Sequence, residues 1–244
     1  CNPGELDLTF DGDGKVTTDF GGVGAGERAT AVVTQADGKI VAAGRSVRTL
    51  PGPSLRQDID WALARYNPNG SLDTSFGSGG KLLTSFGDKD YATDLAIQSD
   101  AKIVVVGFKG DTFQNTFFGD VALARYKPDG TLDKSFGKGG KVTTDLGGID
   151  TARAVAIQTD GKIVVAAGGG TANTCACGLN LLRYNANGTL DTSFGTGGKV
   201  ITLLGSLRSD DGFEDLVIQS DGKIVAGGYT GAGFQGSDAL LVRY

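Results

Sequence analysis

The chain has 244 residues, and its 23 Lys+Arg and 28 Asp+Glu give a formal charge of −5, which argues against a nucleic-acid partner because such a partner requires a basic surface. The absence of His removes the commonest general base and the commonest metal ligand. Gly is abundant at 41 residues, which indicates many tight turns, and hydrophobic residues at 39% are sufficient for a folded core.

The predicted elements repeat along the chain. Residues 1–20 contain a turn and a Thr-rich strand, and groups of strands follow over approximately 29–87, 92–147, 152–205 and 214–244. In the second group, for example, strand-like runs cover 95–98, 103–107, 121–126 and 141–146; they are rich in β-branched residues and bounded by Gly, Asn and Asp. Asp-Gly at 37–38, 160–161 and 221–222 predicts a two-residue turn with positive φ between the first and second strand of a group.

Three motifs mark the repeat. An Arg-Tyr pair ends the third strand, the motif Leu-Asp-x-[Ser/Thr]-Phe follows it, and Gln-x-Asp-Gly-Lys-Ile joins the first two strands, with Ala101 replacing Gly in one copy. The Arg residues recur every 58–60 positions. Four antiparallel strands in such a period match one blade of a β-propeller.

The sequence therefore predicts one all-β domain over 1–244, a single four-bladed β-propeller with four antiparallel strands per blade. The chain starts in the turn before a fourth strand and ends with a third strand, Ala239 to Tyr244. Reading Arg243-Tyr244 and then Cys1 to Asp7 reproduces the order of Arg65 to Asp73, so the N-terminal strand is predicted to complete the last blade and hide its edge. The alternative is an open array that closes by dimerising.

Long stretches of the chain resemble the delta-60 repeat family. The resemblance rests on Phe-Gly-x-Gly-Gly-Lys-Val-x-Thr, on Ile-Gln-x-Asp-Gly-Lys-Ile-Val and on Ala62 to Gly77, and it covers nearly the whole chain. It implies a bacterial protein, secreted or on the cell surface (periplasm, outer membrane or extracellular), with a propeller fold. No activity is established for the repeat, so the resemblance brings no catalytic residue and no cofactor. The copies depart from the pattern at Asp11, at Ala101 and at Leu179-Asn180.

Residues that every copy repeats are expected to serve the fold. We expect an Arg–carboxylate pair in each blade to fix the connection after the third strand, and the repeated Phe residues to pack between neighbouring sheets. A fourfold ligand site is the alternative. The residues concerned are Arg65, Arg125, Arg183 and Arg243, with Asp7, Asp73, Asp133 and Asp191, and Phe10, Phe76, Phe136 and Phe194.

Function is expected on the face where the copies differ. In a propeller the first-to-second and third-to-fourth connections share one face, here called the repeated face, and the other connections form the variable face. Loops on a rigid scaffold commonly carry function, and Arg and aromatic residues suit a protein or glycan partner. The candidate partner-binding residues are Arg45, Arg48, Arg56, Phe108, Phe113, Phe117, Phe118, Arg208, Tyr229 and Phe234.

These features predict a structural or binding module, not an enzyme, that could assemble with itself or with other surface proteins. The alternative function is a carboxylate-dependent glycan hydrolase or lyase using acids of this face, Asp88, Asp90, Asp210, Asp211 and Glu214. The other interpretation of the aromatic residues is that they cap the core. No metal site is expected, because Asp11-Gly-Asp13-Gly lacks the spacing of a calcium loop.

Three cysteines complete the set of candidates. Cys175 and Cys177 lie in one loop and are candidates for a disulfide with each other, whereas Cys1 is expected on the opposite face and out of their reach. Cys1 as first residue suits a lipid anchor; simple secretion or a trimmed start is the alternative. No apolar run reaches the roughly 18 residues of a membrane-spanning helix.

Overall fold

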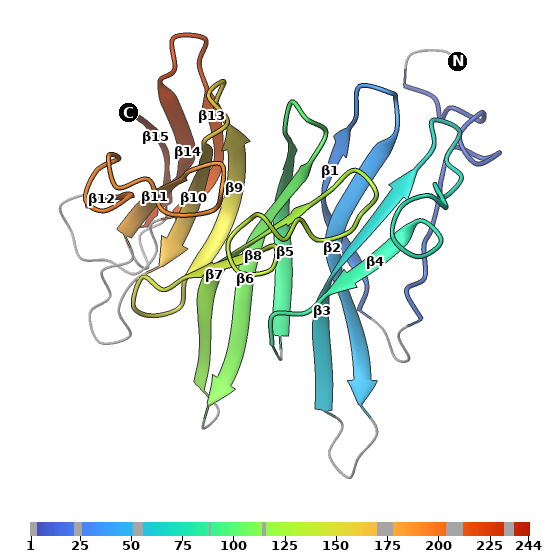
Figure 1. Ribbon diagram of the computed structural model, residues 1–244, viewed down its shortest axis with the longest axis horizontal. Helices are drawn as coiled ribbons and strands as arrows, with labels where there is room; N and C mark the ends of the chain where they lie inside the picture. Colours follow the sequence, from blue (N-terminus) through green and yellow to red (C-terminus); the bar gives the residue numbers. More distant parts are fainter. Residues whose placement is uncertain are drawn as a thin grey trace.

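The structure is a computed structural model that describes residues 4–21, 26–50, 56–87, 89–113, 116–169, 178–203, 212–231 and 237–244. The described residues form an all-β fold of fifteen strands in four units that stand side by side along a row (Figure 1). Among these residues no helix has the length and apolar character needed to cross a membrane.

Each of the first three units has four strands. Unit 1 contains β1 (Arg28–Thr34), β2 (Ile40–Leu50), β3 (Arg56–Tyr66) and β4 (Lys81–Thr84). Unit 2 contains β5 (Lys89–Ile97), β6 (Ile103–Phe113), β7 (Thr116–Tyr126) and β8 (Lys141–Thr144). Unit 3 contains β9 (Thr151–Ile157), β10 (Ile163–Gly169), β11 (Gly178–Tyr184) and β12 (Lys199–Thr202). Unit 4 contains β13 (Gly212–Ile218), β14 (Ile224–Gly231) and β15 (Ser237–Arg243).

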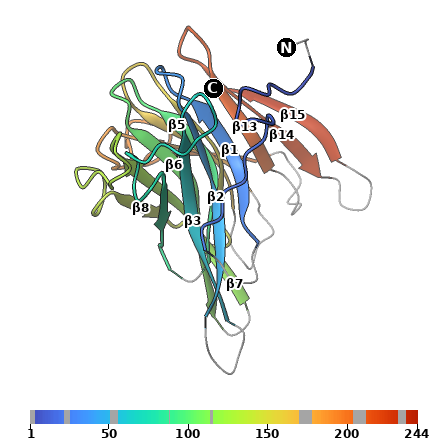
Figure 2. The same cartoon turned by 90° about the vertical axis from the view of Figure 1, so that its right-hand side faces the viewer.

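Within every unit, neighbouring strands pair antiparallel in chain order. One parallel pair, Ile59 with Lys89, joins units 1 and 2 into an eight-stranded sheet, while units 3 and 4 form separate sheets. The hairpins β2–β3 and β6–β7 are the longest and project beyond the other strands in both views (Figures 1 and 2). The described strands therefore form a row of four units in three sheets, and no sheet among them is closed.

The core lies between successive units. The first strands pack in order, β1 on β5, β5 on β9 and β9 on β13. One apolar layer joins units 1 and 2 around Trp61 and Ile103, a second joins units 2 and 3 around Leu123 and Ile163, and a third joins units 3 and 4 around Leu181. Both faces of units 2 and 3 are thus covered, which explains the near-continuous apolar runs of their central strands.

The turn between the first two strands differs from the two-residue turn that Asp-Gly predicts. The Gly38 amide donates to the Gln35 carbonyl at 2.9 Å, and the Gln35 amide donates to the Lys39 carbonyl at 2.7 Å. Only the glycine has positive φ, +80° at Gly38, and Ala101 adopts +61° at the same place in unit 2. This is a three-residue loop, a type I turn followed by a left-handed residue, which matches the twist of the strands equally well.

The predicted N-terminal strand over 15–20 is not formed in the described residues. Segment 4–21 instead lies along unit 1, at the opposite end of the row from β15 (Figure 1). A strand requires a hydrogen-bonded neighbour, and unit 4 does not reach this segment. The number of blades and the closure of the ring stay predictions.

Candidate functional site

Units 1–3 each contain the repeated Arg–Asp pair. Arg65 Nε lies 2.8 Å from Asp73 Oδ2, and the pairs Arg125–Asp133 and Arg183–Asp191 span 3.0 and 2.8 Å. Burial opposes ionisation of Asp133, but hydrogen bonds from Ser135 and the charges of the two neighbouring cations hold its pKa at about 2. A lysine of the same unit also approaches each carboxylate, at 3.0 Å in unit 1, 3.5 Å in unit 2 and 3.1 Å in unit 3.

The same arginines connect each unit to the next. Arg65 stacks over Phe76, with 4.6 Å between the guanidinium carbon and the ring centroid, and its Nη1 donates to the Pro128 carbonyl of unit 2. Arg125 stacks on Phe136 in the same way and donates to the Ala186 carbonyl of unit 3. Arg65 and Arg125 therefore use their donors for contacts inside the protein, and Arg183 bonds Asp191 and Ser193 of its own unit.

Segment 4–21 makes the contacts of a fourth strand from a preceding unit. Thr18 Oγ1 lies 2.6 Å from Tyr66 Oη, as Thr84 lies 2.8 Å from Tyr126 and Thr144 lies 2.8 Å from Tyr184. The Asp11 amide donates to the Asn69 carbonyl at 2.7 Å, matching the bond from Gly77 to Asp129 at 2.8 Å. The segment is thus docked on unit 1 as one unit docks on the next.

The two ends of the row expose side chains that are buried elsewhere. Leu241 of β15 is 78% exposed, whereas its counterparts Leu63, Leu123 and Leu181 are 0% exposed. At the other end Val32 of β1 is 67% exposed, whereas its counterparts are 5–8% exposed: Leu95 6%, Val155 8% and Leu216 5%. Unit 4 and unit 1 therefore each present an apolar face of the kind that packs between all other units.

Charges at the ends are also separated. Arg243 and Lys223 of unit 4 hold the places of the cations that surround Asp73, but their predicted partner Asp7 lies on the segment docked at unit 1. Lys223 instead pairs with the exposed Asp221. Asp7 accepts from the Thr9 amide at 3.0 Å and the Thr9 hydroxyl at 2.7 Å, which lowers its pKa. The structure thus does not bring the fourth Arg–Asp pair together.

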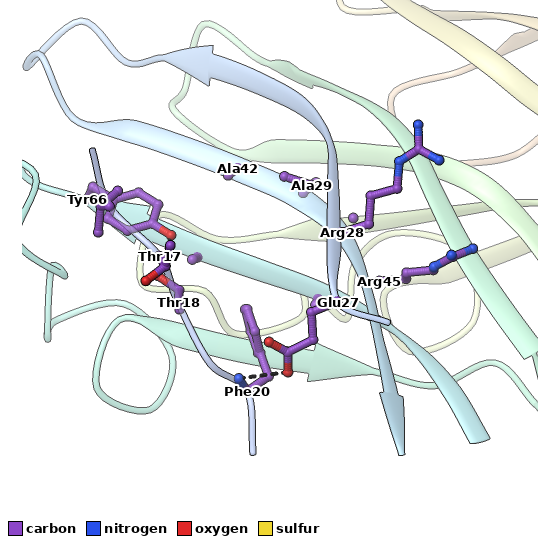
Figure 3. Close-up of a pocket in the computed structure, with 14 residues that line it drawn as sticks. Thr17, Thr18, Phe20, Glu27, Arg28, Ala29, Ala42, Arg45 and Tyr66 are labelled. Carbon is purple, nitrogen blue, oxygen red and sulfur yellow. Dashed lines mark hydrogen bonds between the residues drawn. The ribbon is translucent and has the colours of Figure 1, made fainter. Parts of the chain in front are cut away.

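A cavity of ≈ 410 Å³ lies between segment 4–21 and unit 1 (Figure 3). Its floor is formed by small residues, Ala29, Ala42, Ala62 and Ala64, and Thr17, Thr18 and Phe20 border it from the segment. The residues equivalent to this floor in unit 2, Ala122 and Ala124 among them, are covered by unit 1. The cavity is the space that the inner strands of a preceding unit would fill.

On the variable face, the predicted residues Arg45 and Phe108 both contact Tyr91, which the sequence did not single out. Arg45 lies over the Tyr91 ring at 5.1 Å, and Tyr91 stacks on Phe108 with 4.7 Å between centroids. Arg48 bonds Asp58 at 2.8 Å and Asp60 at 2.5 Å, so it is an exposed cation with two acidic neighbours. Tyr229 is 36% exposed on unit 4, apart from this group.

Several predicted residues lie outside what the structure describes. For Arg56, Phe113, Phe117 and Phe118 only the backbone position in β3, β6 and β7 is described. The predicted residues Arg208, Phe234, Cys1, Cys175 and Cys177, with the acids Asp88, Asp210 and Asp211, are outside the described ranges altogether.

A buried acid lies at the start of the first strand of units 2 and 3, Asp90 within β5 and Asp150 just before β9. Asp90 accepts from the Phe86 and Gly87 amides, the latter at 2.9 Å, and Asp150 accepts from the Leu146 amide at 2.5 Å. Burial raises the pKa of both carboxyls to about 6, and neighbouring acids add to the effect. Glu27 makes the matching bond to the Phe20 amide at 2.9 Å (Figure 3). Asp150 and Glu27 were not predicted, although an acid before each first strand is visible in the repeat.

The first strands of units 2 and 4 carry acids that influence each other. Burial raises the pKa of Asp94, and the charge of Asp215 contributes. Both Asp94 oxygens accept backbone amides, Leu95 and Val155, each at 2.8 Å. Asp94 therefore acts as a link between units 2 and 3.

Comparison with known families gives a match that recurs four times along the chain. A family model described as "Domain of unknown function (DUF5122) beta-propeller" matches residues 35–76, 98–136, 158–194 and 219–244, which together exceed half of the chain. The four matched stretches coincide with the four repeats. None of the curated proteins compared with the chain matches it in sequence.

Solved structures resemble the fold at low identity. A protein of unknown function from Dyadobacter fermentans DSM 18053 has a TM-score of 0.51 and 12% identity, covering 87% of this chain and 59% of its own. A xylan beta-1,4-xylosidase from Bacillus halodurans C-125 has a TM-score of 0.48 and 14% identity, covering 90% of this chain and 42% of its own. This chain thus spans less than two thirds of either structure. At such identities the likeness concerns the fold alone.

Proposed function

We propose, from the premise that this chain belongs to the DUF5122 beta-propeller family, that its own N-terminal segment closes it into a four-bladed propeller. We further propose that this propeller acts as a structural or binding module through its variable face. The observation that carries the binding role is that the repeated polar residues and the variable polar residues make different kinds of contact. In units 1–3 the repeated Arg and Asp side chains pair with each other inside the fold. Polar and aromatic groups that differ between copies, Arg45, Arg48 and Phe108 among the described residues, are expected on the other face.

Closure is supported by the contacts that the two ends of the row would make if they met, because the same contacts occur within the other units. In units 1–3 the central leucine of the third strand pairs with the fourth strand, as Leu63 with Leu82 and Leu181 with Val200. The same register would pair Leu241 with Val16. It would also place Arg243 and Lys223 on Asp7, and the apolar face of unit 4 over the alanine floor of the cavity.

The side chains at the predicted seam are complementary in kind. By strand register, Tyr229 holds the place of Arg45, and Arg28 holds the place of Tyr91. Closure would therefore form the same guanidinium–ring contact as between Arg45 and Tyr91, with the two partners exchanged between the units.

A pair of cysteines tests the closure. In a background with Ser at the three native cysteines, Val16→Cys with Leu241→Cys should oxidise to a disulfide within one chain, and the product should stay monomeric on a non-reducing gel. A disulfide-linked dimer would show that a second copy completes the unit, and no disulfide would show that the ends stay apart. As an independent measurement, Leu241→Ala should cost about 2–5 kcal/mol, as for a buried leucine, and not the roughly 0.5 kcal/mol of a surface site.

Photocrosslinking tests the binding face. A photoreactive residue at Arg48, on the variable face, should crosslink to a partner in intact cells that produce the protein. The matched control is the exposed Lys138 on the repeated face, where crosslinks should be absent. Crosslinks from Lys138 alone, or equal yields from both, would contradict the assignment of the face. The partner is proposed to be a surface protein or a glycan, in keeping with a secreted or cell-surface location.

The alternative of a carboxylate-dependent glycan hydrolase or lyase has weaker support, because described acids such as Asp58, Asp90 and Asp94 bond a cation or backbone amides. Release of reducing sugar from plant or bacterial cell-wall polysaccharides, abolished in a variant of a variable-face acid, would favour this alternative.

A further inference from the structure

Three carboxylates converge at the junction of units 2 and 3. Asp120 belongs to β7, Asp145 directly follows β8, and Asp150 directly precedes β9. Each of them offers a carboxylate oxygen, and these oxygens lie within 4.8 Å of one another. Any two oxygens bound to one Ca²⁺ at about 2.4 Å lie at most about 4.8 Å apart, and the three oxygens satisfy this pairwise limit.

The backbone holds this group in place. The Asp150 amide donates to the Gly119 carbonyl at 2.6 Å, and Gly119 bridges to Ile149 in parallel. The Gly147 amide donates to Asp145 Oδ1 at 2.6 Å, which orders the turn after β8. The loop from 145 to 150 is thereby fixed against β7 at both of its ends.

Asp150 supplies a second observation that points to a ligand. Its side chain is 0% exposed, and its Oδ1 has no hydrogen-bond partner among the described residues. A buried carboxylate oxygen without a donor is costly, since it has lost its water and gained nothing in exchange. Burial, Asp145 and Asp120 all disfavour the charged form of this group, which a bound cation would reverse.

At the preceding junction a cation lies beside the corresponding acids, although Asp90 Oδ1 there also has no hydrogen-bond partner among the described residues. There Asp90 and Asp60 correspond to Asp150 and Asp120, and the Arg48 guanidinium bonds Asp60 at 2.5 Å. Ser85 holds the place of Asp145. At the junction of units 2 and 3, Lys199 donates to the Asp145 carbonyl oxygen at 3.2 Å, and its charge partly offsets those of Asp145 and Asp120 at Asp150.

We propose that Asp120, Asp145 and Asp150 bind one calcium ion, which fastens the connection between units 2 and 3 on the variable face. Three carboxylates supply up to six oxygens, and Ca²⁺ accepts such irregular oxygen sets, with water completing its shell. The site would order the loop that carries the exposed Ile149 next to the proposed partner-binding face.

Calorimetry with Ca²⁺ alone tests the proposal on the EDTA-treated full chain. Wild type should bind one Ca²⁺, and Asp145→Asn should bind it with an affinity at least tenfold lower. Ca²⁺ should also raise the Tm of wild type by several degrees. Asp145 is exposed and Asn keeps the acceptor for Gly147, so this variant should fold. Asp129→Asn, which removes an exposed acid from a comparable turn, should bind as wild type.

Two results would overturn the calcium site. One is the absence of both heat and a Tm shift at millimolar Ca²⁺ in wild type, and the other is unchanged binding in Asp145→Asn. Asp150→Asn gives a separate check, since it should fold without calcium and show no Tm response to it; a wild-type response in this variant would also refute the site.

Discussion

Replacing Asp133 by Ala removes the acid from a buried ion pair. Asp133 and Arg125 have side-chain exposures of only 7% and 6%, and Asp133 also accepts from the Ser135 amide and hydroxyl at 3.1 and 2.7 Å. The variant leaves the Arg125 guanidinium buried without its anion, and breaking such a pair costs about 3–5 kcal/mol. For a chain of this size each kcal/mol lowers the Tm by about 2–4 °C, so the expected fall is on the order of 6–20 °C.

Urea unfolding followed by the fluorescence of Trp61, the single Trp of the chain and 0% exposed, measures this loss. The matched control is Asp129→Ala, since Asp129 lies on the same connection but is exposed and bonds only Thr131. The control should change the free energy of unfolding by roughly 0.5 kcal/mol or less. A loss below about 1 kcal/mol in Asp133→Ala, or loss of partner binding with unchanged stability, would refute the structural role of the repeated pair.

Two further predictions concern single positions. Ala101→Gly should stabilise the protein by about 1 kcal/mol in urea unfolding, because Ala101 adopts a φ of +61° that glycine tolerates better. The mirror variant Gly161→Ala, at a φ of +82°, should destabilise the protein. A free energy of unfolding equal to that of wild type in both variants would contradict the reasoning. Asp90 has a folded-state pKa of about 6, raised by burial from the 3.8 of an exposed carboxyl. As pH rises from 4 to above 6, the unfolded chain loses this proton first, so wild type should lose up to about 3 kcal/mol relative to Asp90→Asn. Parallel pH profiles of the two proteins would show that Asp90 does not titrate in this way.

Much of the local structure follows from the repeat. Glycine or a left-handed residue closes each first hairpin, and β-branched runs form the predicted strands of units 1–4, although the strand predicted over 15–20 does not form. The exact loop could not be read from Asp-Gly alone, because that dipeptide suits both a two-residue turn and a three-residue loop with its left-handed residue at the end. The Arg–Asp pairs lie eight residues apart on one connection, so the sequence determined their meeting almost locally.

The candidate sites depended on contacts between units. Arg45 meets Tyr91, and Asp120 meets Asp150, only because one unit packs on the next at a particular angle, whereas Asp120 and Asp145 are brought together by the pairing of β7 with β8. Sequence spacing does not contain that angle. A repeated acid before each first strand was the available signal for Asp150, but its burial and its missing partner are properties of the packed junction.

The sequence by itself determined the repeating unit, its strands, its turns and the residues that stabilise it, because those contacts are short in sequence and occur once per copy. The tertiary structure decided which faces are covered and which are left for partners: units 2 and 3 are enclosed, whereas Leu241 and Val32 are exposed at the ends of the row. That difference arises because an apolar face is buried only by a neighbouring sheet. Whether a repeat has such a neighbour depends on its place in the row, which the repeat itself does not encode.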